Sequence, residues 1–171
     1  MPKDDQSELF WLVDELDNEL GSVPRSIANS NPKLIHRAVD IILLNPVSQI
    51  LLQRRSQTKD TNPGKWTLSA TGHVTYSQSY DEAARRELEE ELGLVLDLEF
   101  IGKYISYMEN ETEYTAIFKG VTDITPQNFD REEVSEVIWV DLDLLPQFTR
   151  TQPFSLSSIE SVKKANLWRI I

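Results

Sequence analysis

One segment constrains the fold of this chain more than any other, and it runs from Ser79 to Gly93. Ser79 and Glu82 have the spacing of a capping box, and Gly93 supplies the residue type that commonly ends a helix. Between these ends, apolar side chains recur at helical spacing, namely Tyr80, Ala84, Leu88 and Leu92. The sequence therefore predicts a helix over 79–92 with one face packed against the rest of the domain.

Three glutamates lie at the border of that packed face. Glu87, Glu90 and Glu91 are spaced i, i+3 and i+4, so the predicted helix brings their carboxylates together. The carboxylates repel one another, and they lie toward the helix C-terminus, where the macrodipole already disfavours negative charge. A divalent cation with oxygen ligands would relieve both penalties. The pattern therefore indicates a Mg²⁺ site that meets a phosphate-bearing substrate.

The overall charge narrows the class of partner. The chain has 171 residues, a net charge of −11 and no basic block, which argues against a nucleic-acid polymer or an anionic membrane as partner. A polyanionic small molecule would instead need metal ions and a few local cations. The absence of cysteine excludes disulfides and thiolate sites. The first residues, MPKDDQSELF, lack an apolar signal region, so we expect a cytoplasmic protein.

The remaining pattern predicts an α/β domain in which strands and helices interleave. Expected strands cover 8–14, 36–45, 50–55, 98–107, 113–121 and 134–140, with 50–55 pairing with 36–45. The segment 18–24 is expected to be a hairpin turn or return. Expected turns and loops cover 26–33, 46–49 and 56–65, and a short helix or turn covers 141–148. A C-terminal amphipathic helix is expected over 154–167.

The helix and its flanking residues resemble a known motif, the Nudix box of the Nudix hydrolase superfamily. The matching positions are Gly72, Arg86, Glu87, Leu88, Glu90, Glu91, Gly93 and Leu94. The resemblance covers about 36–140 and implies an α/β/α sandwich around a mixed sheet. We expect one domain over 1–171, with an N-terminal strand or hairpin extension at 1–33, the Nudix core at 34–145 and a C-terminal helix at 152–171.

The resemblance also implies a reaction, the hydrolysis of a diphosphate bond in a nucleoside diphosphate linked to another group. Mg²⁺, with Mn²⁺ as the alternative, would be held by the three box glutamates. The expected catalytic residues are Arg86, Glu87 and Glu91, with Glu132 or Glu133 from a late loop as the second choice of base after Glu87. The expected substrate contacts are Gly72, Arg54, Arg55 and Lys65, although ordinary surface charge also explains the three cations.

One position departs from the family pattern. The glutamate expected six residues after Gly72 is Gln78 in this chain. Gln78 can still accept a hydrogen bond from Arg86, but it carries no charge. This departure keeps open a third class of function, a non-catalytic module that binds a nucleotide or diphosphate.

A narrower resemblance links LIHRAV, GKWTLSATGHV and ENETEYTAIF to isopentenyl diphosphate isomerase, a relative with the Nudix fold. Its metal-binding histidines and glutamates match His36, His73, Glu109 and Glu111, of which we expect His73 and Glu111 to be ligands and His36 to be packed. The catalytic cysteine of the isomerase is Thr71 here, and a further metal histidine is Asn29.

Thr71 decides between the two enzymatic readings. A threonine hydroxyl is far less acidic than a thiol and does not readily exchange a proton with an allylic carbon. Hydrolysis of a small diphosphate is therefore the leading expectation, and isomerisation of isopentenyl diphosphate is the alternative. The segment 8–24 could pair with a second copy in a homodimer or cover its own sheet.

Overall fold

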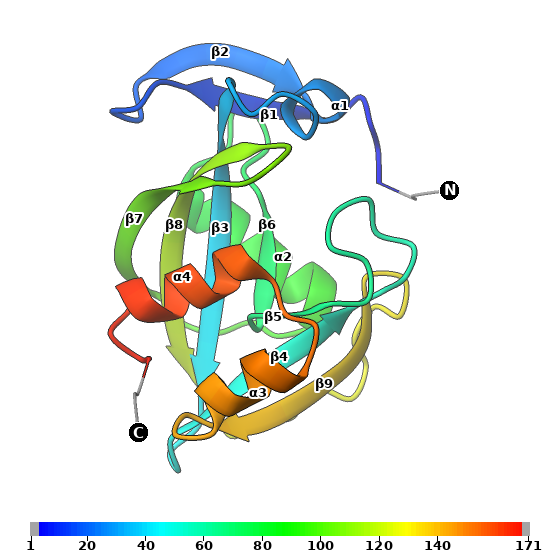
Figure 1. Cartoon of the computed structure of the whole chain (residues 1–171), viewed down its shortest axis with the longest axis vertical. Helices are drawn as coiled ribbons and strands as arrows, with labels where there is room; N and C mark the ends of the chain where they lie inside the picture. The colour runs from blue at the N-terminus through cyan, green and yellow to red at the C-terminus, as the bar shows by residue number, and fades with distance from the viewer. Residues whose placement is uncertain (1–3, 169–171) are drawn as a thin grey trace.

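The computed structural model describes residues 4–168, and these form one mixed sheet with helices on both faces (Figure 1). The strands are β1 (Leu9–Val13), β2 (Glu19–Pro24), β3 (Ile35–Leu44), β4 (Gln49–Arg55), β5 (Trp66–Thr67), β6 (Ala70–His73), β7 (Glu99–Tyr107), β8 (Thr112–Val121) and β9 (Val134–Asp141). The helices are α1 (Arg25–Ala28), α2 (Tyr80–Leu92), α3 (Leu145–Thr151) and α4 (Leu156–Lys164).

Strand β3 is the centre of the sheet. It runs parallel to β8 along its whole length and antiparallel to β6 and β1. The expectation that 50–55 pairs along 36–45 is wrong, because β3 and β4 pair only at Leu44 and Ile50. Strand β4 pairs instead with β9, so the two strands diverge after their turn (Figure 1). This divergence leaves β6, rather than β4, paired with the middle of β3, from Ala38 to Ile41.

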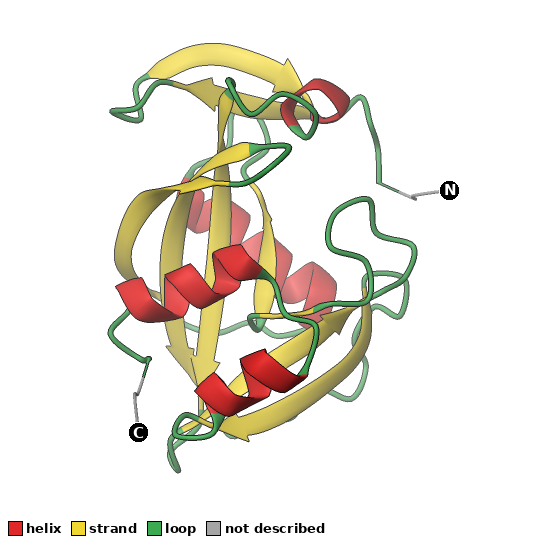
Figure 2. Cartoon of the chain, viewed as in Figure 1, coloured by secondary structure: helices red, strands yellow, loops and turns green. Residues whose placement is uncertain are grey.

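Helix α2 covers one face of the sheet, and α3 and α4 cover the other (Figure 2). Leu88 and Leu92 of α2 are buried against Val39 and Ile41 of β3. Ile42 belongs to the opposite cluster with Val162 of α4. Burying a side chain of this size contributes about 1.5–3 kcal/mol. The alternation along β3 thus directs one set of residues toward α2 and the other toward α4.

The ends of α2 agree with the sequence prediction. The Ser79 side chain accepts a hydrogen bond from the Glu82 backbone, and the Glu82 side chain accepts one from the Ser79 backbone, which completes the capping box. Gly93 ends the helix with a φ of 66°, a left-handed conformation that glycine adopts without a steric penalty. The helix is therefore fixed at both ends and holds its glutamates in a defined register.

Other elements differ in detail from the expectation. The loop expected at 26–33 begins with the short helix α1, and the C-terminal helix is shorter than 154–167. The two short strands β5 and β6 were not predicted, because each has few residues and mixed polarity. Within residues 4–168, no helix combines the length and apolar character needed to cross a lipid bilayer.

Candidate active site

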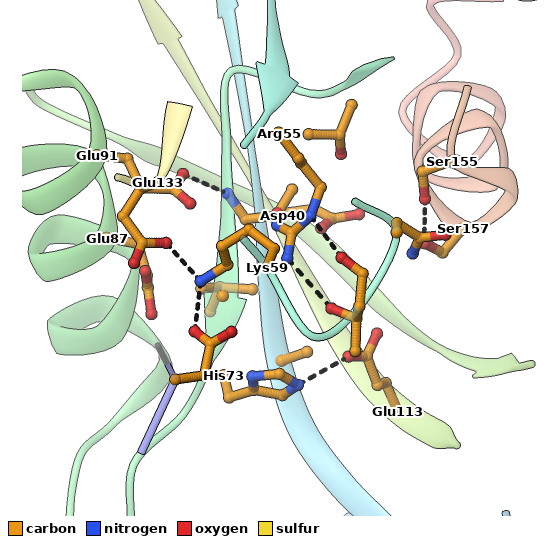
Figure 3. A pocket seen from close by; sticks show the side chains of 18 of the residues that line it. Asp40, Arg55, Lys59, His73, Glu87, Glu91, Glu113, Glu133, Ser155 and Ser157 are labelled. Atoms are coloured by element: carbon orange, nitrogen blue, oxygen red, sulfur yellow. Dashed lines mark hydrogen bonds and ion pairs between the residues drawn. The ribbon is translucent and has the colours of Figure 1, made fainter. Parts of the chain in front are cut away.

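A cavity of about 300 Å³ lies where α2, β3 and β6 meet the loop that follows β4 (Figure 3). A volume of this size falls at the lower end of the range for small-molecule sites. The three box glutamates line it, as do Gly72 and Arg86. The predicted Nudix helix therefore presents its acidic edge to a cavity.

The glutamates differ in their exposure. Glu91 is buried, and its Oε2 accepts hydrogen bonds from Gln53 Nε2 (2.6 Å) and from the Thr71 backbone N–H (3.1 Å). Glu87 lies against Gly72, where even a Cβ atom would overlap its carboxyl group. The Glu90 side chain is 58% exposed at the mouth of the cavity. The three carboxylates thus extend from the cavity floor to its rim.

Arg86 connects the helix to the preceding strand. Its Nη1 lies 2.9 Å from Glu87 Oε1 and 2.9 Å from Glu90 Oε2, and its Nη2 donates to the His73 backbone oxygen (2.9 Å). Its Nε donates to Gln78 Oε1 at 3.3 Å, so the hydrogen bond expected of Gln78 is present. Gln78 therefore retains the structural contact of the family glutamate, although without its charge.

Burial makes this site energetically unfavourable for negative charge. Burial and the neighbouring Glu91 carboxylate raise the pKa of Glu87 to about 8, against the lowering effect of Arg86. Burial also raises the pKa of Glu91 to about 7. A bound divalent cation would stabilise both carboxylates in their charged form. The donor set of three carboxylates fits Mg²⁺ or Mn²⁺.

Two cations face the carboxylates across the cavity. Arg55 is buried and donates to Thr61 through Nε and Nη2, and no carboxylate among residues 4–168 lies within ion-pair distance of it. Lys59 lies between the carboxylates of Asp4 and Glu133. A guanidinium group with unused donors is suited to bind phosphate oxygens. Lys59 was not expected from the sequence, where it is one polar residue in a polar loop.

The other predicted substrate contacts lie elsewhere. Arg54 lies on the opposite side of β4 from Arg55, donates to the Gly64 backbone oxygen (3.0 Å) and does not line the cavity. Lys65 lines a second, outer cavity. Of the two late-loop glutamates, Glu133 lines the inner cavity, whereas Glu132 is exposed outside it. Arg54 and Arg55 lie on opposite sides of β4 because successive side chains of a strand point to opposite faces.

A second cluster of potential metal ligands lies in the same cavity region. His36, His73, Glu111 and Glu113 each offer one ligand atom, and these atoms lie within 4.8 Å of one another. His73 Nε2 is 3.3 Å from Glu113 Oε1, and His36 Nε2 is 3.8 Å from both carboxylates. Strand pairing brings them together, because β3 lies between β6 and β8.

The charges of this cluster also fit a cation. Burial lowers the pKa of His36 well below its ordinary value and that of His73 to about 3, so both imidazoles are neutral. Burial and mutual repulsion raise the pKa of Glu111 to about 8. His36 Nε2, His73 Nε2 and Glu111 Oε2 are buried without a hydrogen-bond partner. Neutral imidazoles and carboxylates form a mixed donor set that suits Mn²⁺ or Zn²⁺.

This cluster differs from the expected ligand set. Glu109 is exposed in the turn before β8, whereas Glu113 lies beside His36 across the β3–β8 pairing. Alternate residues of a strand point to the same face, so Glu111 and Glu113 direct their side chains to the same side. His36 belongs to the cluster, although packing was the expectation for it. The sequence feature that could have indicated Glu113 is its spacing of two residues from Glu111 at the start of the expected strand.

The two positions that depart from the isomerase pattern also lie near these clusters. Thr71 lines the cavity one residue before Gly72. Asn29 follows α1, and both side-chain amide atoms are buried without a hydrogen-bond partner. The thiol needed for the isomerase reaction is therefore replaced by a hydroxyl at the cavity wall.

Comparison with known proteins identifies the family. The NUDIX domain model matches residues 34–161. An uncharacterized Nudix hydrolase of Pseudomonas aeruginosa is 34% identical, and the match covers 92% of each chain. The chain belongs to the Nudix hydrolase family. A crystal structure from Deinococcus radiodurans shares the Nudix fold, with a TM-score of 0.80 and 23% identity over 95% of this chain and 100% of that one.

Two further relatives of this Nudix protein carry more specific names. A prenyl-diphosphate phosphatase of Methanosarcina mazei is 35% identical over 82% of this chain and 84% of its own. An isopentenyl-diphosphate Delta-isomerase of Serratia proteamaculans is 32% identical over 85% of this chain and 83% of its own. Both named substrates are diphosphates, which fits a cavity lined by box glutamates and cations.

Proposed function

We propose that this Nudix protein hydrolyses a diphosphate bond in a small organic compound and depends on a divalent cation, with Mg²⁺ as the first choice. The observation that supports the proposal is the arrangement within one cavity. Glu87, Glu90 and Glu91 line one wall, and the cations Arg55 and Lys59 face them. Carboxylates and cations in this arrangement suit a metal-bound diphosphate, whose charge both groups share.

The residues of the chain have distinct roles in this proposal. Glu87, Glu90 and Glu91 would hold the metal, which supplies an acidified water and neutralises charge on the phosphates. Arg55 binds phosphate oxygens through its unused N–H groups. Gly72 lets the substrate and the Glu87 carboxylate approach the backbone closely. Arg86 keeps the helix in register with β6 through the His73 carbonyl.

The proton of the attacking water needs an acceptor. Glu87 lines the cavity, and a bound cation would keep its carboxylate charged and so able to accept a proton. Glu133 also lines the cavity, but it is paired with Lys59 and positions that cation. We therefore assign proton transfer to Glu87 and the orientation of Lys59 to Glu133.

A substrate screen with the variant Glu91→Gln tests the proposal. The panel contains nucleotide sugars, dinucleotides, nucleoside triphosphates, coenzyme A and isopentenyl diphosphate. The wild type should cleave at least one diphosphate, and chelation should stop the reaction. Glu91→Gln should lower kcat by at least about 100-fold, in the range found when a group that stabilises a transition state is removed.

The exposed Glu89 on the same helix provides the matched control. Glu89→Gln removes the same charge from the solvent side of α2 and should retain wild-type turnover. If Glu91→Gln keeps the turnover of Glu89→Gln while its circular dichroism is unchanged, the assignment of the site is wrong. Failure of the wild type to cleave any panel member would favour a module that only binds its ligand.

The second candidate function is isomerisation of isopentenyl diphosphate. The observation that favours it is the cluster of His36, His73, Glu111 and Glu113, together with the relatives named as isomerases. The observation against it is Thr71, which lines the cavity where the isomerase pattern has a cysteine. A hydroxyl group is a poor source of the proton that this reaction needs.

A further inference from the structure

A buried carboxylate lies in the cavity at a point that the proposed reaction does not use. Asp40 of β3 is 7% exposed and lines the same cavity as the box glutamates. Its neighbour across the antiparallel pairing with β6 is Thr71. In the view of Figure 3, Asp40 lies between the box glutamates and the serines that precede and begin α4.

The Asp40 carboxylate is only partly satisfied by the protein. Ser161 Oγ donates to Oδ2 at 2.6 Å, and no other side chain or backbone N–H among residues 4–168 donates to this carboxylate. A buried carboxylate normally accepts several hydrogen bonds, because an unsatisfied acceptor costs about 1–3 kcal/mol. The free oxygen therefore has capacity for a donor that enters the cavity.

Hydroxyl groups surround this end of the cavity. Besides Thr61, which binds Arg55, the hydroxyl groups that line the cavity belong to Thr67, Thr71, Ser155, Ser157 and Ser158. Thr67 Oγ1 and Ser158 Oγ are 2.6 Å apart, and Ser155 Oγ and Ser157 Oγ are 3.0 Å apart. Hydroxyl groups that bond in such pairs keep further donor and acceptor capacity.

Apolar side chains are scarce in the cavity. Among the described residues that line it, only Ala38, Val39 and Met108 present apolar side chains. A hydrocarbon chain placed against Asp40 would remove water from the carboxylate and supply no hydrogen bond in return. The cavity therefore opposes a prenyl group on physical grounds, although one relative is named for prenyl diphosphates.

We propose that Asp40 and the surrounding hydroxyls form a specificity subsite for a hydroxyl group on the organic part of the diphosphate substrate. This inference rests on the proposed hydrolytic function. A hydroxyl can donate to the carboxylate and can accept from Ser or Thr, so it satisfies both halves of the subsite. Asp40 is a positioning residue for substrate choice and takes no part in bond cleavage.

The pKa of Asp40 is consistent with a hydroxyl partner. Burial, with a smaller contribution from the Glu113 carboxylate, raises it to about 7, against the lowering effect of the Ser161 hydrogen bond. The raised pKa makes the neutral form of Asp40 more accessible than that of an exposed aspartate. A hydroxyl donates to the carboxylate and accepts from the carboxylic acid, so it fits the subsite in either form. An ammonium group would fit only the charged form.

A matched pair of substrates tests the inference. The two probes are propyl diphosphate and 3-hydroxypropyl diphosphate, which differ by one hydroxyl and carry no prenyl group. We expect the kcat/KM of the wild type to be at least about 10-fold higher for the hydroxylated probe, since sites built around a hydroxyl strongly reject an analogue that lacks it. Asp40→Leu should reduce this ratio to below about 2-fold, whereas Asp40→Asn should keep part of the preference.

Controls make each outcome decisive. Asp123→Leu changes an exposed aspartate and should leave the ratio at the wild-type value. If Asp40→Leu fails to fold, Ser158→Ala replaces it and should also lower the ratio. Equal kcat/KM for the two probes in the wild type overturns the inference, as does a preference that survives Asp40→Leu.

Failure of the hydrolysis itself is distinguishable from failure of the subsite. If neither probe releases phosphate, the proposed function fails for this substrate class. Calorimetry with the same two probes then gives the ratio of dissociation constants for the wild type and Asp40→Leu. A ratio of at least about 10 in the wild type that Asp40→Leu abolishes supports the subsite, and a ratio near one overturns it.

Discussion

Gly72→Ala should lower the activity of the protein and leave its stability nearly unchanged. A Cβ atom at Gly72 would overlap the Cδ and Oε1 atoms of Glu87, and its three nearest heavy atoms all belong to that carboxyl group. The carboxyl group must move by more than about 1 Å to reach ordinary van der Waals separation. Because it is the end of a flexible side chain, it can do so without moving the backbone.

The expected magnitudes differ for activity and stability. A displacement of about 1 Å at a reacting centre can cost 100-fold in rate, so kcat/KM should fall by about that factor. The free energy of unfolding should change by less than about 1 kcal/mol, because the atoms that the Cβ overlaps are the end of one flexible side chain. Steady-state phosphate release measures the first quantity, and urea unfolding followed by circular dichroism measures the second.

Gly102 of β7 supplies the matched control. A Cβ atom at Gly102 has no heavy atom within 4 Å, so Gly102→Ala should alter neither quantity. The reasoning is refuted if Gly72→Ala retains the activity of Gly102→Ala. It is also refuted if Gly72→Ala loses activity only because it unfolds, which the urea curve would reveal.

Two further predictions concern charge and metal binding. In the folded protein, the pKa values of Glu87 and Glu91 are raised above their unfolded values, so the folded state binds more protons than the unfolded state. The free energy of unfolding of the metal-free protein should therefore fall as pH rises from about 6.5 to 8. The pKa values of His36 and His73 are lowered in the folded protein, so these histidines make stability rise with pH, but only below about pH 6.5, where the unfolded chain protonates them. Mg²⁺ should reverse the loss, and a thermal midpoint that is independent of pH in chelator would contradict this account. For the second cluster, calorimetric Mn²⁺ titration should show two classes of site, of which His73→Gln removes one and Glu91→Gln the other. A single class in the wild type that His73→Gln leaves unchanged would exclude a metal at the second cluster.

The sequence predicted those parts of the molecule whose signals are local. The capping box at Ser79, the stop at Gly93 and the acidic edge of the helix all depend on residues within a few positions of one another. The family pattern then indicated the fold, which the structure and the family match confirm. The roles of the individual site residues remain predictions.

The parts that were missed depend on pairing between distant strands. Glu113 joins His36 only because β8 runs parallel to β3 in one register. Lys59 faces the cavity because its loop folds back against the Asp4 carboxylate. Asp40 lies in a predicted strand, and nothing in its local pattern shows that it faces α4. The residues near each of these positions in the sequence do not show which distant strand or loop they contact.

Incubation with isopentenyl diphosphate and a cleavable panel member in ¹⁸O-labelled water tests the central claim most directly. Phosphorus NMR and mass spectrometry follow the label, and proton NMR follows the double bond. Hydrolysis predicts that one ¹⁸O atom enters a phosphate product, that chelation stops this, and that Glu91→Gln nearly abolishes it. Conversion of isopentenyl diphosphate to its allylic isomer, with no label in any phosphate, would contradict the account and make the His36 and Glu113 cluster the catalytic centre.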